Sequence, residues 1–170
     1  MSTLIQSRYP LIAFGLLVGI IAGIFFSVSQ VLLTIALGGG PFDYLRVIAS
    51  LVLGPDALSP TVSLPIAILV GVLTRLTLAS VFGIVFVVIL DAARQLHAAP
   101  LLLLVFGSVY GFGLWIVNFL VLAPAIAPQF AMVDQFWIGF FAHTFLYGTI
   151  LGGCVAALRR TMLSTNDPNP

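Results

Sequence analysis

The chain has 170 residues, of which 61% are hydrophobic and only 6% are charged. Soluble domains carry about 25% charged residues, so this composition predicts an integral membrane protein. The net charge of +1 comes without a basic run, which argues against nucleic acid as a partner, and the single cysteine excludes an internal disulfide.

Four apolar stretches are each long enough to cross about 30 Å of hydrocarbon, which takes about 20 helical residues. The first of them is too long for the apolar region of a signal peptide, so we expect it to be retained. The sequence predicts an all-α polytopic membrane protein with one transmembrane domain (1–163), built as a four-helix bundle, and a disordered tail (164–170). The spans are expected near residues 10–37, 65–90, 100–123 and 136–158.

Small residues recur at four-residue spacing along all four spans. Such rows let helices approach closely in lipid, where hydrophobicity alone gives little drive for association. They predict packing within the bundle, although one of these faces could instead seat the helix of a partner subunit. The packing residues are Gly15, Gly19, Gly23, Ala79, Gly83, Gly107, Gly111, Gly148 and Gly152.

The chain also contains a faint internal repeat. Residues 18–23 resemble residues 106–111, and residues 81–83 resemble residues 146–148. Spans one and two would then correspond to spans three and four in the same orientation, an arrangement that occurs in transporters.

Between the first two spans, residues 41–54 are bounded by Gly-Pro pairs and have a polar face. Asp43, Arg46 and Ser50 lie at positions i, i+3 and i+7, while apolar side chains cover the rest of the helix. This pattern predicts an amphipathic helix lying in the membrane interface. Asp43 and Arg46 are also spaced for an ion pair.

Arginines outside the spans indicate the orientation of the chain. Arg8, Arg94, Arg159 and Arg160 all fall on one side of the membrane, and only Arg46 lies on the other side. Because positive residues concentrate in cytoplasmic segments, we expect a multi-pass protein of a prokaryotic cytoplasmic (inner) membrane with both termini in the cytoplasm.

Arg75 lies inside the second span, where a permanently charged guanidinium is costly. Counted from the outer ends of the spans at about 1.5 Å per residue, Arg75 and His143 lie roughly 13–15 Å deep, and Asn118 and Gln30 roughly 10 Å deep. Each span therefore supplies one strongly hydrogen-bonding side chain to the outer half of the membrane.

This polar layer contains one permanent cation and no carboxylate, unless Asp43 or Asp134 reaches into it. It predicts a site for an anionic or carbonyl-bearing group, such as a lipid headgroup, a quinone or a small carboxylate. In the alternative interpretation, Arg75 extends toward the outer interface and the amides bond neighbouring helices. His143 alone does not make a metal site, so no metal or other cofactor is expected.

The second half of the chain resembles a known family. Residues 141–152 read Phe-Ala-His-Thr-Phe-Leu-Tyr-Gly-Thr-Ile-Leu-Gly and are followed by a basic end, while Trp115, Asn118, a proline-containing loop and an acidic residue precede them. This arrangement is similar to small bacterial inner-membrane proteins of the YagU-like family. The resemblance implies an inner-membrane location and no established activity. A counterpart histidine is expected in span two, but that stretch has Arg75 and Thr77 instead.

The sequence thus favours a non-enzymatic membrane protein, acting as an accessory or stabilising subunit of a larger membrane complex. Its partners would be membrane lipids and other subunits, or a second copy of itself. The alternative is a small carrier or a lipid-, quinone- or anion-binding protein that uses the polar layer as its site. A membrane enzyme that uses His143 is the weakest interpretation, because no catalytic motif accompanies this residue.

Overall fold

The computed structural model describes residues 2–93, 99–129 and 136–165, with side chains described between residues 10 and 158 of these ranges. The described residues are mostly helical and contain no strand, and four stretches are long and apolar enough to cross a membrane. These stretches are Pro10–Ala36, Leu64–Ala92, Pro100–Ile126 and Phe136–Leu158. The predicted all-α fold with four spans is therefore confirmed.

The first two spans are single helices, and each of the last two contains a π-helical segment. Helix α1 covers Ser2–Ala36 and α3 covers Leu64–Ala92, with α2 (Asp43–Leu53) and the 3-10 turn η1 (Pro55–Leu58) between them. The third span consists of α4 (Pro100–Trp115), the π-helix η3 (Ile116–Leu122) and α5 (Ala123–Ile126). The fourth consists of α6 (Phe136–Phe141), the π-helix η5 (Ala142–Thr149) and α7 (Ile150–Thr165).

Proline and glycine set the helix boundaries. Proline lies in the first turn of α3 and α4, where its missing N–H costs no helical hydrogen bond. Gly38 follows α1 and Gly54 follows α2, both with a positive φ, which only glycine adopts without strain. Helix α7 continues to Thr165, and the remainder of the predicted disordered tail lies outside the described residues.

Helices α1 and α3 touch through glycines. A Cβ atom on Gly83 would overlap the carbonyl oxygen of Gly15 and would lie 2.5 Å from the Cα atom of Gly19. One turn further along α1, Gly23 lies against the side chain of Ala79. The backbones of the two helices are therefore in direct contact, as the small-residue spacing requires.

The third and fourth spans form a second contact of the same kind. A Cβ atom on Gly148 would overlap the carbonyl oxygen of Gly107 and would lie 2.9 Å from the Cα atom of Gly111. Gly152 continues the row against the backbone of Leu103. The bundle thus consists of two helical hairpins, each held by its own glycine contact.

The two glycine contacts follow one pattern, in which a glycine of the second helix lies between two glycines of the first. The faint sequence repeat therefore recurs in the packing. The glycines that correspond in the packing are shifted by one helical turn from those that the sequence repeat aligns. Gly15, rather than Gly19, corresponds to Gly107. All the predicted packing glycines lie in these two contacts, so they are occupied within the chain.

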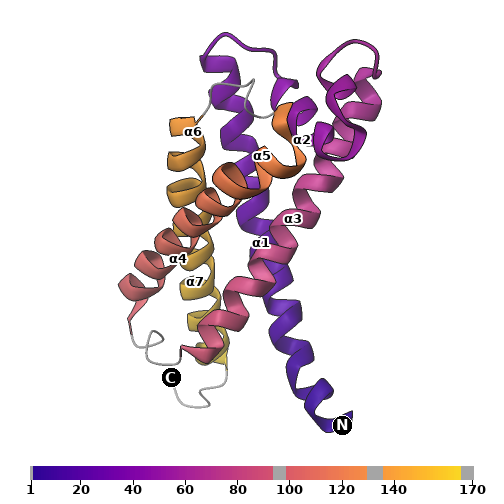
Figure 1. Cartoon of the computed structure of the whole chain (residues 1–170). Coiled ribbons are helices and arrows are strands. Elements are labelled where there is room, and N and C mark those ends of the chain that lie inside the picture. The colour runs from indigo at the N-terminus through magenta and orange to yellow at the C-terminus, as the bar shows by residue number, and fades with distance from the viewer. Residues whose placement is uncertain (1, 94–98, 130–135, 166–170) are drawn as a thin grey trace.

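Tyrosine hydroxyls join the two hairpins. Tyr147 is buried and donates a hydrogen bond of 2.9 Å to the Ala79 carbonyl, while Tyr110 donates one of 2.7 Å to the Phe82 carbonyl. Both acceptors belong to α3, so the fourth and third spans are each fastened to the same helix. Figure 1 shows that α1 begins and α7 ends at one end of the bundle, whereas α2 and α5 lie together at the other end.

Helix α2 packs onto the bundle instead of presenting a continuous polar face. The backbone of Leu45 lies against Gly71 of α3, where any side chain on the glycine would overlap it. Ser50, predicted on the polar face, is 1% exposed. Its burial is tolerated because its hydroxyl donates to the Val47 carbonyl and because Gln129 Nε2 donates to its carbonyl at 3.1 Å. A position of α2 in the membrane interface stays a prediction.

The predicted ion pair between Asp43 and Arg46 is not formed, because each side chain has other partners. The Asp43 carboxylate accepts a hydrogen bond of 2.6 Å from the Gly40 backbone N–H. Arg46 Nη1 donates to three carbonyl oxygens of the segment that leads into α3. These belong to Ala57, Ser59 and Val62, at 2.9, 2.9 and 3.1 Å. Backbone carbonyls thus replace the carboxylate as the partner of this guanidinium.

Substitution of Arg46 tests this arrangement. We expect Arg46→Met to lower the free energy of unfolding by about 2 kcal/mol, since carbonyls left without a donor cost about 1–3 kcal/mol each when buried. Asp43→Asn should cost less, because an amide oxygen still accepts the Gly40 N–H. Denaturation of the purified protein in detergent, followed by circular dichroism, measures both changes. Equal losses for the two variants would instead indicate an ion pair.

Candidate ligand-binding site

A cavity of about 410 Å³ lies between the two hairpins, at the end of the bundle that carries α2. Small-molecule sites enclose roughly 300–1,000 Å³ and are mostly apolar with a few polar groups, and this cavity has both properties. Every span and helix α2 contribute to its wall. The polar lining residues are Gln30, Tyr44, Thr74, Arg75, Asn118 and His143, and the apolar ones include Phe26, Phe82, Phe119 and Leu122.

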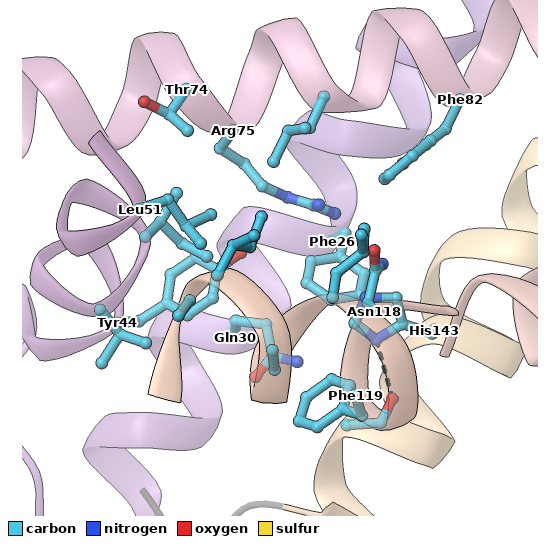
Figure 2. A pocket seen from close by; sticks show the side chains of 18 of the residues that line it. Phe26, Gln30, Tyr44, Leu51, Thr74, Arg75, Phe82, Asn118, Phe119 and His143 are labelled. Carbon is cyan, nitrogen blue, oxygen red and sulfur yellow. Dashed lines mark hydrogen bonds between the residues drawn. The ribbon is translucent and has the colours of Figure 1, made fainter. Parts of the chain in front are cut away.

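The four residues that the sequence places in one polar layer all line this cavity. Gln30 comes from α1, Arg75 from α3, Asn118 from η3 and His143 from η5. Figure 2 shows Arg75 extending toward Phe26, with the Asn118 amide and the His143 ring beside the same space. The structure thus brings these residues together, while their role in binding stays a prediction.

Arg75 does not extend to the surface, as the alternative interpretation requires, because only 5% of it is exposed. Its guanidinium carbon lies 4.0 Å from the ring centroid of Phe26 and 5.5 Å from that of Tyr147. Ring faces attract a cation, but they leave the in-plane N–H groups free. Nε and Nη2 are buried and have no hydrogen-bond partner among the described residues.

Asn118 and His143 both lie in the π-helical segments of their spans. A π-helical turn contains one extra residue, which changes the direction of the side chains that follow, and such turns are frequent at functional sites. His143 Nδ1 lies 2.9 Å from the Gly139 carbonyl, which can only accept, so Nδ1 carries the proton. In the neutral ring Nε2 is then an acceptor.

Tyr44 of α2 is a lining residue that sequence reasoning missed. Its hydroxyl is buried without a hydrogen-bond partner among the described residues, and its ring lies 6.5 Å from that of Phe26. Burial raises the pKa of Tyr44, so the phenol is a neutral O–H donor at physiological pH. In the sequence Tyr44 belongs to the apolar face of a connecting segment, and only the docking of α2 onto α3 moves it into the cavity.

Phe26 was also missed, although one sequence signal pointed to it. It lies four residues before Gln30 and therefore on the same face of α1, one turn away from a residue of the predicted layer. The structure packs its ring against the Arg75 guanidinium and edge-on to the His143 ring, with centroids 5.2 Å apart. Phe26 thus connects the cation with the histidine.

The cavity is electropositive. Arg75 is the one charged side chain among the described residues that line it, and no described lining residue is acidic. The carboxylate of Asp43 binds the Gly40 N–H outside the cavity, and Asp134 lies outside the described residues. The wall therefore presents three donor groups that have no acceptor in the part of the chain that the structure describes: Arg75 Nε, Arg75 Nη2 and the Tyr44 hydroxyl.

This chain matches no protein-family model, no curated protein and no solved structure. The resemblance to the YagU-like family stays a prediction that rests on the second half of the sequence. The structure shows a four-span helical protein, and the chemistry of the cavity is the basis for the function proposed below.

Proposed function

We propose that the protein binds the anionic oxygen group of a small molecule in the cavity, within the membrane. The observation that carries this proposal is the buried guanidinium of Arg75, whose Nε and Nη2 lack any acceptor among the described residues. The Tyr44 hydroxyl, in the same wall, is a third donor for which the described residues supply no acceptor. Two oxygens of a carboxylate or phosphate suit the planar fork of an arginine.

Charge decides between an anion and a neutral carbonyl compound such as a quinone. A buried donor without an acceptor costs about 1–3 kcal/mol, and either type of ligand removes that cost. A buried ion without a counter-ion costs several kcal/mol more, and only an anion removes this second cost. The contact with Phe26 is worth about 0.5–2 kcal/mol, which is too little to replace a counter-ion.

The accessory-subunit role depended on the glycine rows as docking faces for another membrane protein. The two hairpin contacts bury these rows inside the chain. No contact among the described residues favours this role, which stays a prediction.

Short amphiphiles that differ only in charge test the proposal. Purified protein in mild detergent is heated with hexanoate, hexyl phosphate or the neutral hexanamide, and the unfolding temperature is recorded. We expect either anion to stabilise the protein, by about 2.7 kcal/mol at a hundredfold excess over its dissociation constant. Hexanamide should not change the unfolding temperature of the protein. Neither anion should change the unfolding temperature of the variant Arg75→Leu. Equal stabilisation by hexanamide, or by a short-chain quinone alone, would overturn the proposal.

Tyr44→Phe isolates the contribution of the phenol. We expect this variant to bind hexanoate about tenfold more weakly, because a hydrogen bond to a charged group contributes about 1.5–3 kcal/mol. Its stability without ligand should be unchanged or higher, since the hydroxyl has no hydrogen bond to any described residue that it could lose. Titration with hexanoate against the unfolding temperature gives both quantities. Tyr147→Phe is the control, because that hydroxyl donates to the Ala79 carbonyl, so the substitution should lower stability.

A further inference from the structure

The outer rim of the cavity is aliphatic. Four of the lining residues are also substantially exposed on the surface of the protein, and they come from α2 and from the segment of η3 and α5 that faces it. These rim residues are Leu51, Val52, Leu122 and Ile126, with exposed fractions of 37, 65, 39 and 70%. The rim therefore presents aliphatic side chains, and no charged group, to a ligand that enters the cavity.

The most deeply buried polar groups of the same cavity lie on its inner wall. Arg75 and Gln30 are each 5% exposed, and the Tyr44 hydroxyl is buried. The cavity thus changes from hydrogen-bond donors inside to aliphatic side chains outside. A ligand complementary to this gradient has an anionic head and an apolar chain.

We propose that the ligand is an amphiphile, with its anionic oxygens on Arg75 and its apolar chain leaving the cavity between α2 and α5. This inference rests on the proposed function and specifies its ligand class. A small hydrated anion would lose its water at the aliphatic rim with no partner there to replace it. An amphiphile already dissolved in the membrane meets the rim from the side, so its chain remains in apolar surroundings throughout.

A photoreactive ligand tests where the chain lies. Hexadecanoate that carries a diazirine in mid-chain is added to the protein in nanodiscs. The sample is irradiated, and mass spectrometry identifies the labelled residues. We expect label on the rim residues of α2 and α5, and at least a tenfold loss of that label in Arg75→Leu. Phosphatidic acid with the same diazirine distinguishes a two-chain lipid from a free fatty carboxylate, and label from either on the rim supports the proposal.

Two exposed aliphatic residues provide a matched pair of variants. Ile126 on the rim is 70% exposed, and Leu101 near the start of α4 is 69% exposed and does not line the cavity. Ile126→Asn should reduce the rim label severalfold, whereas Leu101→Asn should leave it unchanged. Stabilisation by hexanoate should persist in Leu101→Asn, since Leu101 does not line the cavity.

The outcomes separate this inference from the proposed function. If hexanoate binding depends on Arg75 but the label is spread evenly over exposed residues such as Leu101, the amphiphile inference is overturned and anion binding stands. If neither hexanoate nor hexyl phosphate binds through Arg75, both fail.

Discussion

Arg75→Leu is expected to abolish anion binding and to make the ligand-free protein more stable. The substitution removes a permanent charge that is only 5% exposed and that has two N–H groups without acceptors among the described residues. Replacing a buried ion pair by apolar side chains of similar volume is often stabilising, by about 1–4 kcal/mol, and a buried charge without a counter-ion is less favourable still. The lost contact with Phe26 subtracts about 0.5–2 kcal/mol, so we expect a net gain of about 1–2 kcal/mol.

Denaturation without ligand and titration with hexanoate measure the two effects on the same sample. Arg75→Lys is the control, because an ammonium keeps the charge but cannot present two donors in a fixed plane. It should bind hexanoate weakly and gain no stability. Reduced stability of Arg75→Leu without ligand would show that the guanidinium holds the fold together and would remove the reason to expect an anion.

Gly107→Ala should destabilise the bundle strongly, although alanine is the better helix former. A Cβ atom at this position would overlap the Gly148 carbonyl oxygen and would lie 3.0 Å from the Gly152 nitrogen. Because both atoms belong to the backbone, helix α4 must move away from η5 and α7. Overpacking of this kind costs about 1–3 kcal/mol, and occasionally more.

Gly113 provides the control on the same helix. A Cβ atom there meets nothing within 4 Å, so Gly113→Ala should be neutral or should stabilise the helix by up to about 1 kcal/mol. The two variants carry the same chemical change, and the difference between their unfolding free energies measures the glycine contact alone. Equal stability of the two variants would contradict the hairpin packing.

Much of the fold follows from helix length and residue spacing. The apolar stretches are bounded by proline, glycine and polar residues, so their ends could be located to within a few residues. The polar layer was found by counting at about 1.5 Å per residue, which works because a span is straight and its ends lie at known depths. That arithmetic places Arg75 and His143 at one level, and the structure has both in the wall of one cavity.

The missed features depend on contacts between segments that lie far apart in the sequence. Nothing local reveals that α2 docks through Leu45 onto Gly71, and this docking is what brings Tyr44 into the cavity. Spacing alone paired Arg46 with Asp43, whereas three carbonyls of the following segment bind the guanidinium. The π-helical turns around Asn118 could not be predicted either, since their residues would also suit an α-helix.

The most direct measurement is the NMR signal of the Arg75 Nε–H in ¹⁵N-labelled protein, assigned by its loss in Arg75→Lys. We predict a saturable shift of this signal when hexanoate or hexyl phosphate is added, and none with hexanamide, because the anion accepts a hydrogen bond from Nε. A signal that stays unchanged at saturating concentrations of both anions would contradict the claim that Arg75 binds an anionic ligand.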